Sequence, residues 1–230
     1  MLLVGRPEGA LGELATEIGE RAHAFSIDLS EADAGERIEG KLAEVGAYCD
    51  VLVNSAGVGV FGPAAETSRK EHLDLVDVNI RAVTELTLRF LPGMIARRRG
   101  GVLNLGSITG YTPGPDMSTY FASKAYVRSF TTAVAEEVRG TGVTVTCFSP
   151  GVVRTAFFER FGVGKTRLFK LAPRSDPAAA AEAGWRGFRA GKRLVIPRFV
   201  DRLIVGGCLI LPDAVLLRLI SALMGRRRGA

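Results

Sequence analysis

The chain has 230 residues, a net charge of +6 and 47% hydrophobic residues, a composition typical of one globular domain with a large core. Its basic residues cluster at predicted helix ends without interleaved aromatic residues, so we expect no nucleic-acid partner. Cys49, Cys147 and Cys208 are too few and too far apart for a disulfide framework or a metal site, and they indicate a reducing compartment. The first residues have neither a basic region nor a long apolar core, so we expect a cytoplasmic protein without a signal peptide.

Short apolar runs alternate with helical patterns along the chain. Because several runs are apolar on both faces, they predict a doubly wound α/β domain whose parallel sheet is covered by helices on both sides. Strands are predicted at 2–4, 22–27, 50–54, 102–106, 143–149 and 193–197. Helices are predicted at 11–19, up to about 46, at 68–99 with a kink near Pro92, and around Tyr120 up to about 138.

Small and polar residues follow these strands at their carboxyl ends. They are Gly5-Arg6, Asp28-Leu29, Asn54-Ser55-Ala56-Gly57, Ser107 and Ser149-Pro150-Gly151. Turn formation alone places such residues at strand ends. Ligands of open parallel sheets bind beyond the same ends, however, and so many together predict a cofactor cleft.

Tyr120 and Lys124 have the spacing Y-x-x-x-K at the start of a predicted helix, and Ser107 ends the strand before it. Four residues are about one helical turn, so the ammonium can approach the phenol. A cation beside a phenol favours the phenolate, which would otherwise form only near pH ~10. The pattern therefore suits proton transfer to or from a carbonyl or an alcohol, although the Tyr–Lys spacing alone also arises by chance.

These three residues, the N-x-A-G formed by residues 54–57, and Asn79 on the helix between them resemble the short-chain dehydrogenase/reductase family. The resemblance covers roughly residues 2–197 and implies a Rossmann-like fold and a hydride transfer between a nicotinamide cofactor and an alcohol/ketone pair. It implies Tyr120 as the general acid/base and Lys124 as its pKa-lowering partner and ribose ligand. Ser107 would orient the carbonyl oxygen, and Asn79 would support a proton relay.

The resemblance also implies which residues hold the cofactor. They are Arg6, Asp28, Leu29, Asn54, Ala56, Gly57, Pro150, Gly151, Val153 and Thr155, together with Tyr120 and Lys124. Family members that prefer NAD have an acid at the end of their second strand, where this chain has Gly5 and Arg6. Because a guanidinium there favours the 2′-phosphate, NADP(H) is expected over NAD(H).

The family's opening strand and its T-G-x-x-x-G-x-G loop, which cradles the pyrophosphate at a helix N-terminus, have no counterpart in this sequence. The first predicted strand, 2–4, matches the family's second, so about 30 residues, one strand–helix unit, are expected to be missing. In the family's strand order 3-2-1-4-5-6-7 that strand is central, and its loss would expose two strand edges. A start codon placed too late and a true truncation both explain this. The intact remaining positions favour the first.

Residues 199–230 form an apolar tail after the domain at 1–198. The run from Leu203 to Pro212 is too short to span a bilayer, so a dimer contact, a cap over the substrate pocket and an interfacial membrane helix ending in arginines remain open. Phe157, Phe158, Phe161 and Phe169 suggest an apolar substrate, but core or lid packing explains them equally well. His23 is expected beside a strand and His72 on an exposed helix surface, neither as a ligand.

The sequence therefore predicts a homo-oligomeric oxidoreductase that transfers a hydride between NADP(H) and an apolar alcohol/ketone pair, without a metal. The alternative is a non-catalytic remnant that binds a partner or a membrane surface through its tail. The absence of the glycine-rich loop favours this alternative.

Overall fold

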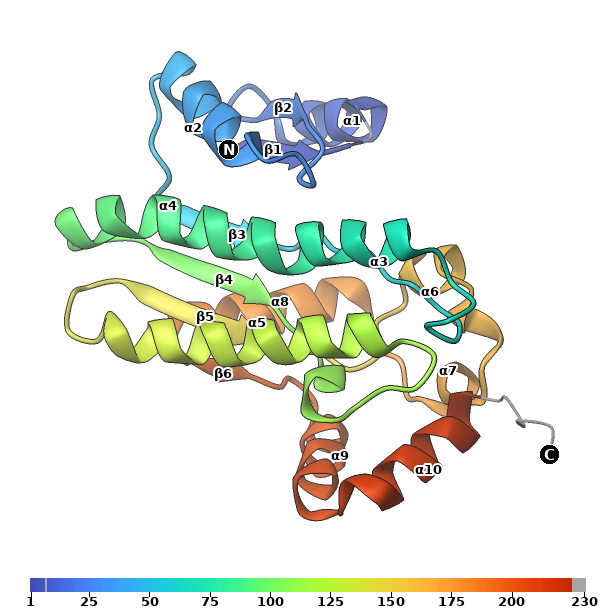
Figure 1. Cartoon of the computed structure of the whole chain (residues 1–230). Coiled ribbons are helices and arrows are strands. Elements are labelled where there is room, and N and C mark those ends of the chain that lie inside the picture. The colour runs from blue at the N-terminus through green and yellow to red at the C-terminus, as the bar shows by residue number, and fades with distance from the viewer. Residues whose placement is uncertain (7, 225–230) are drawn as a thin grey trace.

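The computed structural model describes residues 1–6 and 8–224. Strands and helices alternate along it, as predicted (Figure 1). The first half contains β1 (Leu2–Gly5), α1 (Glu8–Ile18), β2 (His23–Ser26), α2 (Ala34–Glu44), β3 (Val51–Asn54), α3 (Arg69–Val76), η1 (Asp77–Ala82), α4 (Val83–Ala96) and β4 (Gly101–Leu105). The second half contains η2 (Ile108–Tyr111), α5 (Ser118–Glu137), β5 (Thr144–Phe148), α6 (Phe157–Arg160), η3 (Val163–Lys165), α7 (Arg167–Leu171), α8 (Pro177–Arg189), β6 (Leu194–Val195), α9 (Phe199–Ile210) and α10 (Asp213–Met224).

The strands form two parallel sheets, which confirms the predicted α/β class. One sheet pairs β1 with β2, and the other has the order β3-β4-β5-β6. The register aligns Asn54 with Asn104, and Asn104 with Cys147. All strands of a parallel sheet end on the same side, so the residues that follow β3, β4 and β5 come together there.

Helices pack on both faces of the four-stranded sheet. α4 and α5 cover one face, and α8 covers the other beside β5 and β6 (Figure 1). Asp176 caps the N-terminus of α8, because its side chain accepts hydrogen bonds from the backbone amides of Ala178 and Ala179. Pro177 occupies the first turn. The main core lies between α2, α4, α5 and the strands, with Met94 and Val102 wholly buried.

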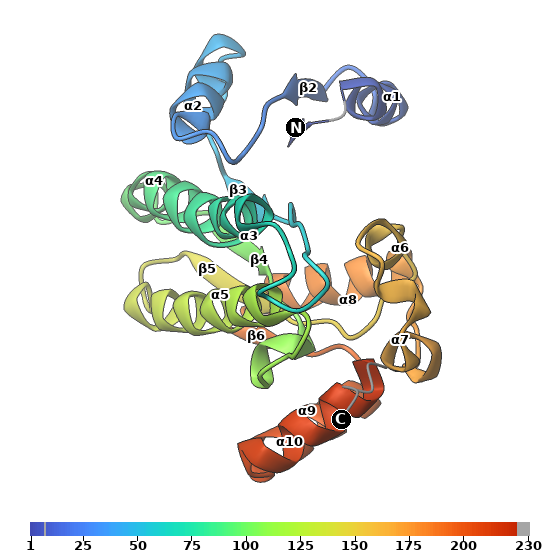
Figure 2. The ribbon, with the colours of Figure 1, turned by 45° about the vertical axis from the view of Figure 1, so that its right-hand side comes forward.

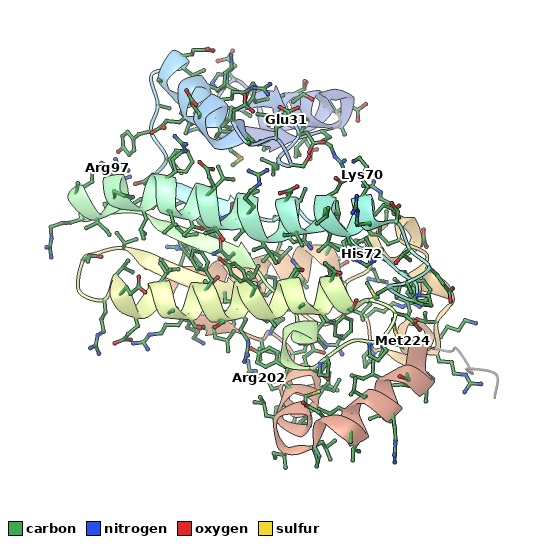
Figure 3. All side chains as sticks on the ribbon, viewed as in Figure 1. Glu31, Lys70, His72, Arg97, Arg202 and Met224 are labelled. Carbon is green, nitrogen blue, oxygen red and sulfur yellow. The ribbon has the colours of Figure 1, made fainter. Side chains whose placement is uncertain are left out.

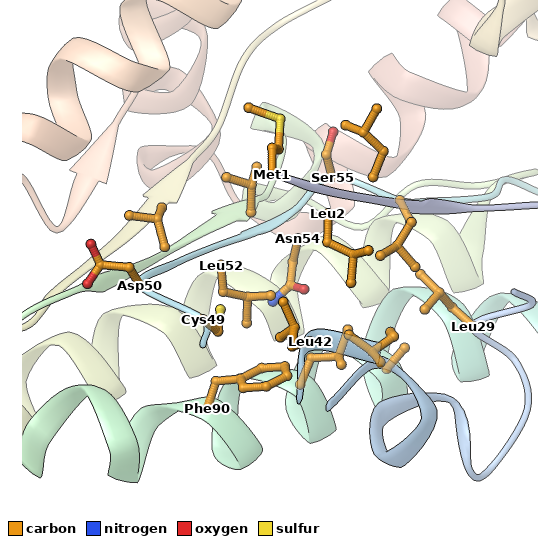
Figure 4. A pocket seen from close by; sticks show the side chains of 18 of the residues that line it. Met1, Leu2, Leu29, Leu42, Cys49, Asp50, Leu52, Asn54, Ser55 and Phe90 are labelled. Atoms are coloured by element: carbon orange, nitrogen blue, oxygen red, sulfur yellow. The ribbon is translucent and has the colours of Figure 1, made fainter. Parts of the chain in front are cut away.

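A cavity of about 640 Å³ separates the two sheets (Figure 4). We call it the inter-sheet slot. Its walls are the facing edges of β1 and β3, together with side chains of α2 and α4, and Trp185 of α8. β1 and β3 are not paired with each other, although every residue of both strands lies in the described part of the chain. Figure 2 shows α1, β2 and α2 on one side of the molecule, with α2 next to α4.

One expectation about the sheet, that helices cover both of its faces along every apolar strand, was wrong. The apolar strand at 50–54 is not covered on both faces, because Val51 is 38% exposed and Val53 is 52% exposed. α8 packs mainly on β5 and β6, farther along the sheet. A third apolar side chain, that of Trp185, is 42% exposed at the same cavity.

The long predicted helix at 68–99 is interrupted, but not at Pro92. Pro92 lies inside α4, whereas the break is the π-helical stretch η1, which separates α3 from α4. The proline removes a hydrogen bond from the carbonyl of Leu88, whose side chain is 53% exposed, so water can reach this side of the helix. π-Helical stretches inside α-helices recur at functional sites, and this one contains Asn79.

The tail forms two helices, α9 and α10, on the side of the molecule opposite β1 and β2 (Figure 1). Leu216, Ile220 and Met224 bury one face of α10, while Leu209 and Ile210 at the end of α9 are 64% and 84% exposed. Among the helices that the structure describes, none is both long and apolar enough to cross a membrane. Arg226–Arg228, at the end of the tail, lie outside the described residues.

Candidate active site

Three elements bring the predicted catalytic residues together at the carboxyl end of the four-stranded sheet. Ser107 follows β4, Tyr120 and Lys124 lie near the start of α5, and Asn79 lies on η1. The Ser107 hydroxyl hydrogen-bonds to the Tyr120 phenol. Gly57, in the loop after β3, lies close to two of these side chains. A Cβ atom added to it would be 3.5 Å from Asn79 Oδ1 and 3.8 Å from Lys124 Nζ.

Lys124 is a buried cation. Its side chain shares a helix face with Tyr120, and Nζ donates a 2.8 Å hydrogen bond to the carbonyl oxygen of Leu105 at the end of β4. Burial lowers the pKa of Lys124 to about 8, because the charged form loses its hydration. An ammonium group has three donors, and Leu105 accounts for one. Two donors are therefore left for a ligand.

Tyr120 behaves differently from the expectation that Lys124 would lower its pKa. Burial raises the pKa of Tyr120, opposed by the hydrogen bond from Ser107. Lys124 Nζ lies 5.8 Å from the phenol ring centroid and points to Leu105. The Phe157 ring of α6 covers the phenol, at 5.5 Å between centroids. In this state the phenol therefore remains protonated at neutral pH.

Asn79 is 1% exposed, and the backbone of Val58 holds its side-chain amide at both ends. Oδ1 accepts from the Val58 amide, and Nδ2 donates to the Val58 carbonyl, each at 3.0 Å. Nδ2 also donates to Ser123 Oγ at 3.1 Å. Asn79 thus ties the loop after β3 to the helix that carries Tyr120 and Lys124.

The Asn54 side chain, for which the resemblance implies a cofactor contact, hydrogen-bonds to neighbouring side chains inside the fold. Its amide donates to Asn104 Oδ1 at 2.8 Å, and Asn104 in turn donates to Thr131 at 3.0 Å. Thr87 accepts a longer bond from Asn54 at 3.3 Å. Buried amides need such partners, and these hydrogen bonds fix the orientation of the Asn54 side chain.

Arg6 and Asp28 end β1 and β2 side by side. Their side chains form a 3.7 Å ion pair, and the Arg6 side chain is 61% exposed. The Ser30 amide and hydroxyl donate to Asp28 at 2.9 and 2.8 Å, and these bonds lower the pKa of Asp28. The exposed guanidinium therefore lies at the end of β1, paired with a carboxylate that balances part of its charge.

The remaining predicted cofactor residues lie in two places. Leu29, Asn54 and Ala56 line the inter-sheet slot at its carboxyl end. Pro150, Gly151, Val153 and Thr155 form the loop after β5. The Pro150 carbonyl accepts from the Ile108 amide at 3.1 Å, and Val153 forms an isolated bridge with Ser175. The loop is thus anchored beside Ser107.

An apolar cluster encloses Tyr120 on its outer side. Phe157 and Phe161 pack there with Val60, and Ile220 and Met224 of α10 belong to the same cluster (Figure 3 labels Met224). The sequence pointed to the aromatic residues but not to the two residues of α10. Their four-residue spacing on an apolar helix was the available signal. Phe169 is buried, and the side chain of Phe158 lies outside the description.

His72 is not the exposed helix residue that the sequence predicts. Its ring nitrogens lie 2.7 Å from Thr67 Oγ1 and 2.6 Å from Thr119 Oγ1, and the ring is half-buried (Figure 3). Because Thr119 precedes Tyr120 in the first turn of α5, His72 helps fix the start of that helix. His23 is the exposed first residue of β2.

The model of the short chain dehydrogenase family matches residues 1–164. The chain belongs to the short-chain dehydrogenase family. It is 38% identical over 153 residues to a very-long-chain 3-oxoacyl-CoA reductase of Laccaria bicolor, covering 63% of this chain and 45% of that protein. It is 32% identical over 154 residues to the NADP-dependent 3-hydroxy acid dehydrogenase YdfG of Escherichia coli K12, covering 66% of this chain and 62% of that protein.

Among solved structures, a short-chain dehydrogenase of Streptomyces avermitilis is similar with a TM-score of 0.78 and 28% identity, covering 96% of this chain and 85% of that one. The chain spans less than two thirds of the length of the two curated relatives. The short-chain dehydrogenase family thus accounts for the fold and for the motifs that meet at the strand ends.

The buried ammonium leads to a prediction about stability. The folded-state pKa of Lys124 is about 8, below the ordinary 10.5, so the unfolded chain binds more protons between these values. The contribution of Lys124 to the free energy of unfolding therefore rises with pH in this window. Lys124→Met removes this titration. The free energy of unfolding of Lys124→Met minus that of wild type should fall by about 2 kcal/mol from pH 7.5 to 9.5, measured by urea unfolding.

The exposed Lys170→Met is the matched control, and its difference from wild type should stay constant over the same pH range. Comparing variants at each pH cancels the titration of cysteines and tyrosines, which all three proteins share. A constant difference for Lys124→Met would show that the ammonium is hydrated in the folded state.

Proposed function

We propose that this protein is an oxidoreductase that transfers a hydride between NADP(H) and an alcohol/ketone pair with an apolar substituent. The observation that carries the proposal is the convergence of Ser107, Tyr120, Lys124 and Asn79 at one point beyond the sheet. A non-catalytic remnant would have no use for a buried lysine beside a buried, serine-bonded phenol. The cost of burying both groups therefore favours the enzyme.

The residues present fit a nicotinamide nucleotide. Lys124 would hold ribose hydroxyls with its two remaining donors, and the glycine at 57 leaves room beside it. Arg6 offers an exposed guanidinium for a 2′-phosphate at the end of β1. When bound, the nucleotide would supply or accept the hydride.

The chain's own residues would then bind and protonate the oxygen of the substrate. Ser107 would hold the carbonyl oxygen, and Tyr120 would give it a proton during reduction. The raised pKa of Tyr120 keeps the phenol protonated, which favours the reducing direction. Lys124 would stabilise the phenolate left behind, since the two groups share one helix face. Asn79 would keep Lys124 and the loop after β3 in place.

The apolar cluster around Tyr120 supports the apolar substrate. Phe157 and Phe161 approach Gly59 so closely that a Cβ atom there would lie 3.3 Å from either ring. An aliphatic or aromatic ketone would pack against these rings with little loss of solvation free energy. A charged substrate would lose its hydration there without gaining a partner.

Filling the inter-sheet slot would complete the cofactor site. We propose that the slot takes one further parallel strand, supplied ahead of Met1 by a strand–loop–helix unit. One wall of the slot is the unpaired edge of β1, and the other is the unpaired edge of β3. Each of these strands is parallel to its neighbour within its own sheet. A strand inserted there would end beside Leu29, Asn54 and Ala56. Its following loop and helix would bring backbone amides to the pyrophosphate.

Self-association and contact with a membrane surface also remain proposals. The exposed apolar side chains of α9 and α10 would serve either, because Phe199, Leu203, Leu209 and Ile210 are each at least 60% exposed. Arg202 and Arg218 flank them on the same two helices and would suit anionic headgroups (Figure 3 labels Arg202).

The first test concerns the chemistry. In a chain extended by an apolar strand, a T-G-x-x-x-G-x-G loop and a helix, Tyr120→Phe should abolish NADPH-linked ketone reduction while NADPH still binds. Tyr126→Phe on the same helix is the matched control, since its hydroxyl lies 2.8 Å from that of Thr84 and not at the candidate site, and it should keep its activity. Turnover of Tyr120→Phe within tenfold of wild type would remove Tyr120 from the mechanism.

The second test concerns the choice of cofactor. Arg6→Ala should weaken NADPH binding about tenfold or more and NADH binding little, because a charge-assisted hydrogen bond to the 2′-phosphate is lost. Arg21→Ala, just before β2 at the opposite end of the strands, should change neither. Titrations of nucleotide fluorescence measure both constants. An equal loss for both nucleotides, or a wild type that prefers NADH, would show that Arg6 does not face the 2′-position.

The third test fills the slot. The extended chain should melt at a higher temperature than the 230-residue chain and gain far more from NADPH, because the slot's apolar walls are then covered. An extension with prolines in its strand is the control, since proline donates no ladder hydrogen bond. If the 230-residue chain melts cooperatively and gains as much from NADPH as the extended one, the slot needs no added strand.

A further inference from the structure

Asp201 is a buried acid whose role the proposed chemistry does not explain. It lies in the first turn of α9 and is 2% exposed, the one carboxylate that is buried among the described residues. Taking a carboxylate out of water costs several kcal/mol unless partners compensate. Its partners therefore indicate what the fold gains by keeping it there.

The side chain of Asp201 faces the loop that follows β5. Oδ1 lies against Gly151, because a Cβ atom added to Gly151 would be only 2.5 Å away, and the Gly151 amide acts on the carboxylate by opposing the rise in pKa that burial causes. Glycine is therefore the residue that fits at 151. Arg198 Nε lies 3.8 Å from Oδ2, too far for a hydrogen bond, and Oδ2 has no hydrogen-bond partner. Gly151 is thus the direct contact.

Gly151 connects Asp201 to the predicted catalytic serine. The carbonyl oxygen of the preceding Pro150 accepts from the amide of Ile108 at 3.1 Å, and Ile108 directly follows Ser107. α9 also packs on η2, the turn that starts at Ile108. Moving Asp201 would therefore move the loop after β5 and the backbone beside Ser107 together.

We propose that Asp201 is a positioning residue that clamps Gly151 and thereby sets the distance between the loop at 150–155 and Ser107. This rests on the proposed function, in which that loop meets the nicotinamide and Ser107 meets the substrate oxygen. Hydride transfer needs both partners held within a fraction of an ångström. The tail helix α9 then belongs to the active site.

Asp201→Ala, Asp201→Asn and the exposed Asp213→Ala, in the first turn of α10, test the clamp. Amide hydrogen exchange is measured on the 230-residue protein without cofactor. Asp201→Ala should speed exchange at Gly151 and also at Ile108 at least tenfold. Asparagine keeps an acceptor oxygen and should restore most of the protection, and Asp213→Ala should match wild type. Unchanged protection of Ile108 in Asp201→Ala would overturn the proposal, whatever the melting temperature does.

Kinetics of the extended chain give the second readout. Asp201→Ala should lower kcat for ketone reduction at least tenfold with a smaller change in the KM for NADPH, and Asp201→Asn should recover most of the loss. A fall in melting temperature with unchanged kcat would make Asp201 merely structural and overturn the proposal. If the wild type itself reduces no ketone, the proposed function fails, whereas the exchange experiment still decides the clamp.

Discussion

The hydrogen-bonded register of β3, β4 and β5 fixes where every group of the candidate site lies. Asn54 stands opposite Asn104, and their side chains bond to each other at 2.8 Å in the core. A slip by one residue would turn Asn104 to the other face and leave both amides buried without partners, at about 1–3 kcal/mol each. This pairing therefore also sets the height of the Leu105 carbonyl, to which Lys124 is bonded.

The site is buried as well as ordered. Tyr120, Lys124, Ser107 and Asn79 are all buried, and Tyr120 packs in one cluster with Phe157 and the inner face of α10. In such surroundings a hydrogen bond or a charge acts more strongly than in water, and an unpaired charge costs more. The same burial explains why the pKa of Tyr120 is raised and that of Lys124 is lowered. The tail at 199–224 shares in this enclosure through Ile220 and Met224.

The sequence predicted the parallel α/β class and the meeting of Ser107, Tyr120 and Lys124, because both follow from local periodicity and from strand ends. It did not predict the direction of the Asn54 side chain, whose partner Asn104 is 50 residues away. The π-helical break at η1 was also missed, since Pro92 gave the stronger local signal although it lies within a continuous helix. The exposed valines of β3 were missed because an apolar strand carries no sign of whether a neighbour covers it.

The fluorescence emission of Trp185 reports on the inter-sheet slot. It is the single tryptophan of the chain, it lines the slot, and its indole is stacked on Phe188 with 42% of the residue exposed. An indole in contact with water emits at longer wavelength than one in an apolar surrounding. Anything that enters the slot and displaces water from Trp185 therefore shifts the emission of the whole protein toward the blue. The state of the cavity can be read from unlabelled protein in solution.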